Sequence, residues 1–323
     1  MKPFKIKGKN IFLTGGTGFI GSTLIATLIN DNKIWCYDNC RRVSPQIKDL
    51  LGHKNLTFIK GDVLDKAKLK RSIPKKADIV FHLAAIAGVS SYYAMPFETM
   101  SINLIGTYNL LEAVKDGKMD LFVDFSTSEV YGKFARHVKE SDDTCQGPVS
   151  DLRWTYSTSK IAAEALSHCY HHKYGLPVVS IRPFNIYGPH QIGEGAIQIF
   201  AGRALKNEDI CVNGDGSQVR AWCYIDDFMQ GVLSCVEARA AAIGNTFNIG
   251  NPRAAVTTLE LARKIIEITG SGSKIRFKKN VRTDVEFRIP DISKAKRILG
   301  YSPSVGLTEG LERSIAWYRE NPL

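Results

Sequence analysis

Residues 14–21 read Thr14-Gly15-Gly16-Thr17-Gly18-Phe19-Ile20-Gly21 and follow directly on a short apolar run, Asn10–Thr14. The glycines of this stretch have the G-x-x-G-x-x-G spacing. In such a turn one glycine permits a tight bend, another lets backbone N–H groups approach a pyrophosphate, and the third lets the next helix pack close to the strand. Because the turn joins a strand to a helix, it predicts a dinucleotide-binding unit.

Short apolar runs alternate with helical patterns along most of the chain. The predicted strands are Asn10–Thr14, Ile34–Tyr37, Leu56–Lys60, Asp78–Leu83, Leu121–Ser126, Pro177–Arg182 and Thr246–Ile249. The predicted helices among them are Phe19–Asn30, Asp65–Ser72, Asn103–Val114 and Ser157–Tyr174. Most strands are apolar throughout, as expected of parallel strands buried on both faces. The order predicts an α/β fold with a doubly wound parallel (Rossmann) sheet of about seven strands.

After Pro189 the alternation loosens and few parallel-strand signals remain. The helical patterns there are Ile197–Lys206, Leu259–Thr269, Ser293–Leu299 and Leu307–Arg319. We expect a smaller C-terminal substrate-binding domain formed by residues 189–223 and 252–323. The dinucleotide-binding domain is expected at residues 1–188, with residues 224–251 returning to its sheet.

The composition is that of a globular protein with a basic charge balance. The 323 residues are 44% hydrophobic and 23% charged, which excludes a disordered tail or a fibrous repeat. Lys and Arg number 43 against 32 Asp and Glu, for a net charge of +11, and this surplus favours anionic partners such as phosphates. No basic run is interleaved with aromatic residues, so no nucleic acid partner is expected.

The cysteine count and the hydropathy predict a reduced, cytoplasmic protein. Seven cysteines are present without a Cys-x-x-Cys, so neither a disulfide framework nor a zinc ribbon is expected. His168, His171 and His172 share a helical stretch but lack a complementary Cys or carboxylate, and no metal site is predicted. The N-terminal stretch lacks the apolar segment of a signal peptide, and no apolar run reaches the roughly 18 residues of a membrane span.

A tyrosine and a lysine lie four residues apart in Tyr156-Ser157-Thr158-Ser159-Lys160, and hence on one helix face. The ammonium group favours ionisation of the phenol, lowering its pKa and making it a base near neutral pH. Ser126-Thr127-Ser128-Glu129 follows the fifth predicted strand. We expect Thr127 to hold a substrate hydroxyl while Tyr156 takes its proton and a hydride passes to the nicotinamide. Strand-end capping is the alternative role for Thr127 and Ser128, and a solvated turn for Glu129.

The end of the second predicted strand indicates which dinucleotide is bound. Asp38 lies 17 residues past Gly21, where a carboxylate accepts the adenosine ribose hydroxyls and selects NAD over NADP. Arg41 and Arg42 follow, and they could accept a 2′-phosphate instead. Asp62-Val63, after the third strand, is placed to meet the adenine edge.

Several longer motifs resemble one superfamily along nearly the whole chain. They are TGGTGFIG (Thr14–Gly21), FHLAA (Phe81–Ala85), STSEVYG (Ser126–Gly132), YSTSK (Tyr156–Lys160), RPFNIYGP (Arg182–Pro189), YIDD (Tyr224–Asp227), NIGNP (Asn248–Pro252) and PDISKAKRILGYSP (Pro290–Pro303). The chain thereby resembles the extended short-chain dehydrogenases/reductases, namely the NAD-dependent nucleotide-sugar epimerases, dehydratases and decarboxylases.

The resemblance implies an NAD that is reduced and reoxidised within one turnover, and a nucleoside diphosphate sugar, best a UDP-sugar, oxidised transiently at C4. The cofactor contacts it implies are Gly15, Thr17, Gly18, Phe19, Ile20, Asp38, Asp62, Val63, Leu83, Ala84, Ala85, Tyr156 and Lys160. The substrate contacts it implies are Asn185, Arg220 and Arg282. It also implies a homodimer through the two helices that match Asn103–Val114 and Ser157–Tyr174.

The residues beside Thr127 bear on which reaction follows oxidation. The predicted catalytic residues are Thr127, Ser128, Glu129, Tyr156, Lys160 and Arg288. The Thr-Ser-Glu run resembles the UDP-glucuronate decarboxylases and the GDP-mannose dehydratases. Arg288-Ile289-Pro290-Asp291 and Arg153-Trp154 also resemble the decarboxylases, whose arginine sits at the reacting carbon. Decarboxylation of UDP-glucuronate type is therefore the leading prediction.

Two features favour other reactions. The decarboxylases usually carry an arginine in the loop that matches His190–Gly195, where this chain has none, and Glu194 would repel a carboxylate substrate if it points inward. Arg282 resembles the second phosphate arginine of the epimerases. A UDP-sugar 4-epimerase, acting on UDP-glucose or UDP-glucuronate, is the next alternative and a dehydratase the third. From another class, a non-catalytic NAD(H)-binding protein would share the fold.

Overall fold

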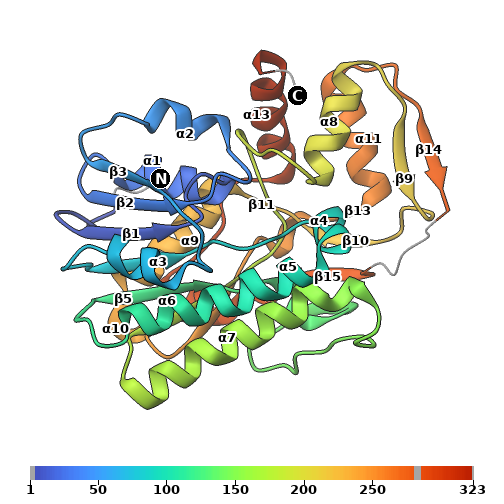
Figure 1. The fold of residues 1–323 in the computed structure, drawn as a ribbon. Helices are drawn as coiled ribbons and strands as arrows, with labels where there is room; N and C mark the ends of the chain where they lie inside the picture. Colours follow the sequence, from blue (N-terminus) through green and yellow to red (C-terminus); the bar gives the residue numbers. More distant parts are fainter. Residues whose placement is uncertain (1–3, 280–284, 322–323) are drawn as a thin grey trace.

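The computed structural model describes residues 4–279 and 285–321 (Figure 1). Its main sheet has the strand order β3-β2-β1-β4-β5-β7-β12, and all of its pairs are parallel. The strands are β1 (Asn10–Thr14), β2 (Lys33–Asp38), β3 (Leu56–Lys60), β4 (Ile79–His82), β5 (Leu121–Phe125), β7 (Val178–Pro183) and β12 (Thr246–Ile249). The predicted doubly wound fold is confirmed. The strand order reverses between β1 and β4, which places a crevice outside their carboxyl ends.

Helices cover both faces of this sheet because successive strand residues point to opposite sides. One apolar core lies under α3 (Lys66–Ser72), α6 (Gly106–Val114) and α7 (Thr155–Tyr174). The other lies under α1 (Phe19–Leu28) and α9 (Ile225–Glu237) and continues to the C-terminal helices. Both α6 and α7 run along the front of the sheet in Figure 1.

The helix predicted over Asn103–Val114 begins as a turn of π-helix. This turn spans Ser101–Ile105, and α6 proper starts at Gly106. The Asn103 side chain leaves the helix to bind the backbone of Ile86: its Oδ1 accepts from the Ile86 N–H at 2.8 Å, and its Nδ2 donates to the Ile86 carbonyl at 3.2 Å. A wider helical turn is a frequent feature of functional sites.

Short helices that the sequence patterns did not predict lie in the connections. They are α2 (Pro45–Leu50), α4 (Val89–Ala94), α5 (Pro96–Met100) and α10 (Arg239–Ala242). Each has at most six residues, too few to show a clear helical period.

The C-terminal part contains more strands than expected. Its helices are α8 (Ala196–Leu205), α11 (Thr258–Thr269), α12 (Ser293–Leu299) and α13 (Leu307–Glu320). Its strands and their partners are β6 (Phe134–Val138), β8 (Ile186–Tyr187), β9 (Ile210–Asn213), β10 (Val219–Ala221), β11 (Cys223–Tyr224), β13 (Ala255–Thr257), β14 (Ile275–Lys278) and β15 (Phe287–Pro290). Four of these pairs are parallel, contrary to the expectation of few parallel strands. The strands have two to five residues, so hydrophobic periodicity could not reveal them.

The chain returns to the main sheet after building part of this second region. β12 pairs with β7 although four short strands and the helices α8, α9 and α10 separate them in sequence. Because the chain returns in this way, we continue to propose that the two domains are divided at residues 188, 224 and 251. Within residues 4–279 and 285–321, no helix is long and apolar enough to cross a membrane.

Candidate functional site

The glycine turn after β1 is shaped by close backbone contacts. Gly15 has φ +75°, and a Cβ on it would lie 2.5 Å from the backbone nitrogen of Ala84. A Cβ on Gly21 would lie 2.4 Å from the Gly15 carbonyl oxygen, so this glycine lets α1 approach the turn. Gly18, by contrast, caps α1 and lines the pocket in front of it. The N-terminus of α1 thus offers free N–H groups to an anion, as a pyrophosphate site requires.

The Asp38 carboxylate at the end of β2 is held by backbone N–H groups. It accepts from Thr17 at 2.9 Å and from Cys40 at 2.7 Å, and it still lines the pocket. Each carboxylate oxygen has a second lone pair left for a ribose hydroxyl. The predicted role of Asp38 in selecting NAD is therefore compatible with its contacts.

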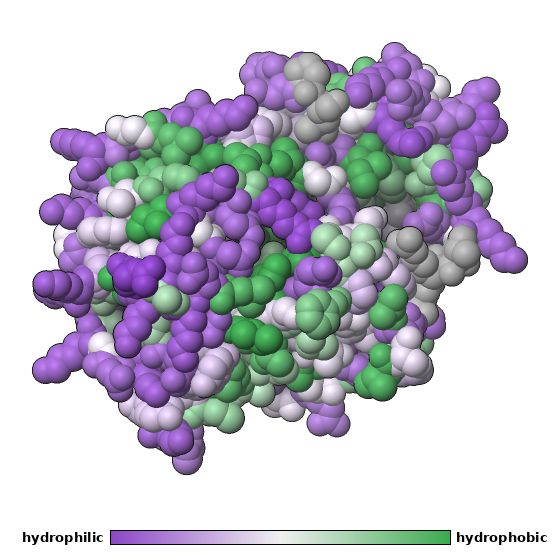
Figure 2. All heavy atoms as spheres, in the orientation of Figure 1, coloured by the Kyte–Doolittle hydropathy of each residue, from purple (hydrophilic) through white to green (hydrophobic). Residues whose placement is uncertain are grey.

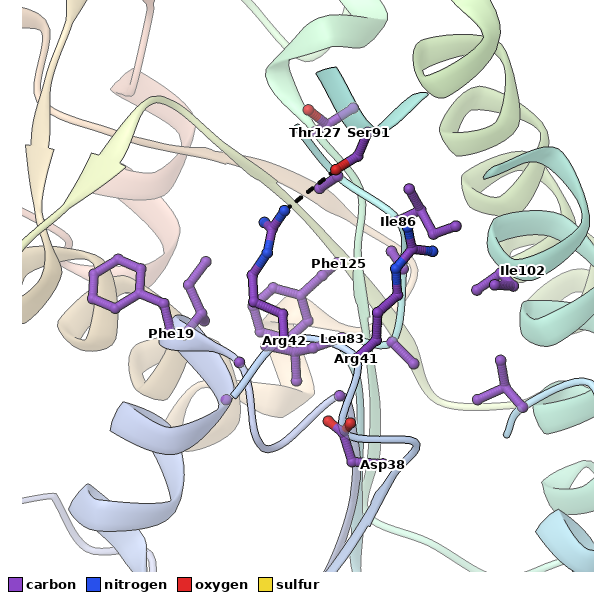
Figure 3. A pocket seen from close by; sticks show the side chains of 18 of the residues that line it. Phe19, Asp38, Arg41, Arg42, Leu83, Ile86, Ser91, Ile102, Phe125 and Thr127 are labelled. Carbon is purple, nitrogen blue, oxygen red and sulfur yellow. Dashed lines mark hydrogen bonds between the residues drawn. The ribbon is translucent and has the colours of Figure 1, made fainter. Parts of the chain in front are cut away.

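A cavity of about 460 Å³ lies above these residues (Figure 3). Most of the predicted cofactor contacts line it: Gly15, Gly18, Phe19, Ile20, Asp38, Val63, Leu83, Ala84, Ala85, Tyr156 and Lys160. Two predicted contacts do not. Thr17 is engaged through its N–H with Asp38, and the Asp62 carboxylate accepts from the Asn39 side chain at 3.0 Å. The placement of Asp62 at the adenine edge stays a prediction.

Two loops meet across the mouth of this cavity. Figure 3 shows Arg41 and Arg42 rising from the loop after β2, with Arg42 joined to Ser91 at 3.4 Å. Glu194 accepts from the Ser90 N–H at 2.6 Å and from the Ser91 hydroxyl at 2.6 Å, and it lies 3.7 Å from Arg42. The charge of Glu194 is thus compensated at the start of α4. Glu194 is therefore no longer expected to repel a carboxylate substrate.

The predicted catalytic trio meets at one wall of the cavity. Thr127, Tyr156 and Lys160 all line it, and the Tyr156 hydroxyl is hydrogen-bonded to the Thr127 side chain. Thr127 also accepts from the Glu129 N–H at 3.2 Å, so it caps a short 3₁₀ turn as well. Burial raises the pKa of Tyr156 to about 12 and outweighs the Thr127 hydrogen bond, which lowers it. The lowered phenol pKa expected from the sequence is therefore not found in the free protein.

A second tyrosine, not predicted from the sequence, stacks on Tyr156. The ring of Tyr92 lies 5.8 Å from that of Tyr156 with 7° between their planes. Tyr92 is 2% exposed, and its hydroxyl has no hydrogen-bond partner among the described residues. The guanidinium of Arg153 lies 5.5 Å from the centre of the Tyr92 ring. No sequence motif marks Tyr92, because only the fold brings α4 against the start of α7.

Glu129 is enclosed by guanidinium groups. Its carboxylate lies 2.7 Å from Arg153 and 3.3 Å from Arg288, which is 1% exposed and also donates to the Ser128 carbonyl. Burial alone would raise the pKa of Glu129, but the charges of Arg288 and Arg153 outweigh it and hold the pKa below its usual value. Glu129 is therefore an ionised carboxylate between cations, neither a solvated turn residue nor a proton-bearing acid.

Further arginines lie near Glu129. Burial lowers the pKa of Arg288 to about 10, and the nearby charges of Arg220 and Arg153 add to that shift. At neutral pH these three arginines remain charged. Guanidinium groups next to Thr127 are suited to bind an anionic substrate group.

The predicted substrate contacts lie beyond this cluster. Arg220 neighbours Arg288 on the adjacent strand, and in the free protein its guanidinium donates to the Val285 carbonyl at 2.6 Å. Asn185, with φ 44°, donates to the Ala221 carbonyl at 3.0 Å and so lies next to the same strand. Arg282 falls outside the described residues.

The known proteins that resemble this chain have the function that the dinucleotide site indicates. The chain belongs to the NAD dependent epimerase/dehydratase family, whose model matches residues 11–250. NAD is its cofactor, and the predicted NAD-dependent nucleotide-sugar enzyme is confirmed at this level. The glycine cradle fits the dinucleotide, since a side chain at Gly15 would collide with the backbone there. When bound, NAD supplies a hydride acceptor and donor.

The relatives differ in the reaction that their names give. The chain is 35% identical to a UDP-N-acetyl-alpha-D-glucosaminuronate decarboxylase of Bacillus cytotoxicus, over 97% of this chain and 98% of the relative. It is 32% identical to UDP-glucuronic acid decarboxylase 1 of Xenopus tropicalis, over 97% and 72%. A solved UDP-glucuronic acid 4-epimerase from Bacillus cereus, in complex with UDP-glucuronic acid and NAD, superposes with a TM-score of 0.87 at 32% identity, over 96% of this chain and 99% of that one.

Proposed function

We propose that this enzyme decarboxylates a UDP-linked uronate through a transient 4-keto intermediate. The observation that carries the proposal is the cluster in which the buried Arg153 and Arg288 contact Glu129 beside Thr127. A sugar carboxylate needs compensating charge when it leaves water, and the guanidinium groups of this cluster can supply it. Each of the three relatives described above is named for a uronate substrate, which supports the same substrate class.

In the first step Tyr156 accepts the proton of the sugar C4 hydroxyl, while Thr127 holds that hydroxyl by a hydrogen bond. The C4 hydride leaves for the nicotinamide and C4 becomes a ketone. Because burial keeps the phenol protonated in the free protein, Tyr156 needs positive charge nearby to ionise. Lys160, one turn further along α7, supplies such a charge in the proposal.

In the second step the 4-ketone accepts the electron pair of the C5–carboxyl bond. That bond breaks, carbon dioxide leaves, and an enolate remains with its charge on the C4 oxygen. Arg288 is placed to hold the carboxylate before the bond breaks, and a proton then adds to C5. Return of the hydride to C4 and of the Tyr156 proton to the C4 oxygen completes the turnover.

The deciding experiment is mass spectrometry of the products. The purified protein is incubated with NAD and, separately, with UDP-glucuronate, UDP-N-acetylglucosaminuronate, UDP-glucose and GDP-mannose. Loss of carbon dioxide from a uronate is the expected result. Loss of water from GDP-mannose would instead identify a dehydratase and overturn the proposal.

The second candidate is 4-epimerisation of the same type of sugar. It is favoured by the UDP-glucuronic acid 4-epimerase that superposes on the whole chain, and by the absence of arginine in the sequence His190–Gly195. An epimerase would use the same oxidation and then let the ketone turn over before reduction. A product of unchanged mass with a new configuration at C4, seen by NMR, would establish it.

We expect Glu129→Gln to uncouple the two steps. The substitution leaves Tyr156 and Thr127 in place, so C4 oxidation proceeds, but it removes the charge that holds Arg153 and Arg288. Decarboxylation should slow by about 10²-fold because the two arginines are no longer held in position, and bound NADH should accumulate, which absorbance shows directly.

The matched control is Glu309→Gln, because Glu309 pairs with Arg313 on the surface. It should leave both steps unchanged. Wild-type turnover by Glu129→Gln would instead favour epimerisation, with Glu129 serving only as a substrate contact.

We also infer that the chain forms a homodimer through α6 and α7. Figure 2 shows green and white side chains gathered over these helices in the lower half of the face. Phe97 of α5, Ile105 of the π-helical turn before α6 and Tyr108 of α6 are 77%, 48% and 42% exposed. Burying such side chains against a second copy would remove apolar surface from water.

Ile105→Glu tests the dimer by placing a charge in the inferred interface. We expect sedimentation velocity to report a dimer for the wild type and a monomer for the variant. Val149→Glu, at a site that is 92% exposed outside these helices, should remain dimeric. A wild-type monomer would contradict the inference.

A further inference from the structure

Five neighbouring strands of the main sheet carry a polar residue at the same level. The parallel register pairs Thr14 with His82, His82 with Asp124, Asp124 with Ser180, and Ser180 with Thr246. None of the five is more than 8% exposed. In β1, β4, β5 and β7 the residue two positions earlier belongs to the apolar core under α6 and α7. These five residues, here called the polar row, therefore face those two helices.

The ends of the polar row are satisfied by hydrogen bonds. His82 joins Thr14 at 2.7 Å and Thr107 of α6 at 2.9 Å, and burial lowers its pKa to about 3, so its ring is neutral. At the other end the Thr246 hydroxyl donates to Glu164 of α7 at 3.1 Å. A buried polar side chain normally finds such partners.

Asp124, in the middle of the row, is different. It is fully buried, and it receives a long hydrogen bond of 3.3 Å from the Ser180 hydroxyl to Oδ2. Its Oδ1 has no hydrogen-bond partner within the described residues. A buried carboxylate in this state stays ionised only when a positive charge lies nearby.

Among the described residues, the groups near Asp124 leave one cation to balance its charge. The titratable and charged side chains around it are Lys160 and Glu164 from α7, His82 from β4 and Arg182 from β7. Arg182 is already paired with Glu164, through contacts of 2.7 and 3.0 Å. His82 is neutral. In the described part of the chain Lys160, which is 3% exposed, is the remaining cation.

Asp124 and Lys160 influence each other through their charges. Burial lowers the pKa of Lys160, and the charges of Asp124 and Glu164 oppose that shift. Burial raises the pKa of Asp124 to about 6, against the opposing charge of Lys160. Each group thus stabilises the charged form of the other.

We propose that Asp124 is a positioning residue that keeps Lys160 protonated and thereby supports ionisation of Tyr156. The inference rests on the proposed roles of Tyr156 and Lys160 and not on the identity of the sugar. Asp124 touches neither substrate nor reacting atoms. It acts through Lys160, from the floor of the sheet beneath α7.

The first test uses no substrate. In the Lys160→Met protein Asp124 loses its counter-charge and should take up a proton at neutral pH. Infrared spectroscopy should then show the C=O stretch of a protonated carboxyl group, which the double variant Lys160→Met/Asp124→Asn lacks and the wild type does not show at this pH. If Lys160→Met creates no band that the Asp124 substitution removes, the proposal is wrong.

The second test is the pH profile of Asp124→Asn. We expect kcat with the nucleotide sugar that the wild type turns over to fall about tenfold, with KM within about twofold. The basic limb of the profile, where Lys160 loses its proton, should move to lower pH by about one unit, because the ammonium has lost its counter-charge. Thermal unfolding establishes that the variant is folded.

Ser180→Ala is the matched control, since it removes the hydrogen bond to Asp124 and keeps the carboxylate. Its basic limb should stay where the wild type has it. Equal losses of kcat in both variants with an unmoved limb would assign Asp124 a packing role and overturn the proposal. If the wild type acts on none of the sugars, the proposed function fails, and the infrared result still decides the role of Asp124.

Discussion

Tyr156→Phe is expected to abolish hydride transfer while NAD stays bound. The phenol is the predicted proton acceptor, and loss of a general base lowers rates by about 10²–10⁴-fold. The aromatic ring itself remains, so its stacking on Tyr92 and the shape of the cavity wall should persist. The change is measured as NADH absorbance after a nucleotide sugar is added, with the NAD content of the purified protein determined separately.

Tyr108→Phe is the control for this variant, because Tyr108 is 42% exposed on α6. It should transfer hydride at the wild-type rate. Full turnover by Tyr156→Phe would refute the assignment of the base. Loss of bound NAD in that variant would show instead that the phenol mainly holds the cofactor.

The second large effect is expected for stability, from Arg182→Met. Arg182 and Glu164 are each 6% exposed and make a two-point contact, and Arg182 also donates to the Tyr131 hydroxyl at 2.7 Å. Methionine would fill much of the volume but leave the Glu164 charge buried without its cation. Breaking a buried pair in this way costs about 3–5 kcal/mol of the free energy of unfolding. Chemical denaturation monitored by circular dichroism measures the loss.

Two further variants separate charge burial from loss of packing. In Arg182→Met/Glu164→Leu no buried charge is left from the pair, and much of the stability should return. Arg276→Met breaks an ion pair of 2.7 Å with Asp209 at a site where both side chains are exposed, and it should change stability little. If the double variant is as unstable as Arg182→Met alone, packing and not charge explains the cost.

The Arg182–Glu164 ion pair lies close to the catalytic side chains. Glu164 accepts from Ser126, which lines the cofactor cavity immediately before Thr127, and Arg182 keeps its charge compensated. Lys160 lies one turn before Glu164 on α7. The buried ion pair therefore supports the wall from which the catalytic side chains project, and its loss should also affect activity in the folded fraction.

Much of the fold followed from the sequence because the decisive signals are local. Each predicted strand of the main sheet agrees with the observed strand to within one residue at either end. Buried parallel strands are continuous apolar runs, and the glycine turn requires particular residues at particular positions. Both can therefore be recognised from residues that are adjacent in the sequence. The short strands of the C-terminal region carry no such signal, and they form only because partners distant in sequence supply their hydrogen bonds.

The site likewise has features that the sequence predicted and features that only the fold shows. Tyr156 and Lys160 are one helical turn apart, so the sequence alone placed them together, and Thr127 followed from its position at the end of a strand. Their environment could not be read from spacing, since the enclosure of Glu129 and the stacking on Tyr92 join elements far apart in the chain. The pKa of Tyr156 shows the difference: helix spacing predicted that a cation would lower it, and burial raises it to about 12.

The sequence by itself therefore determined the doubly wound sheet, the dinucleotide site and the identity of the predicted catalytic pair. Only the tertiary structure decided which charges surround that pair. Polar residues on separate strands come into register only when the sheet forms, as Asp124 and Ser180 do, and their burial then sets which of them stay charged. Electrostatic energies depend on the distance between charges and on their exclusion from water, and neither is fixed until the chain has folded.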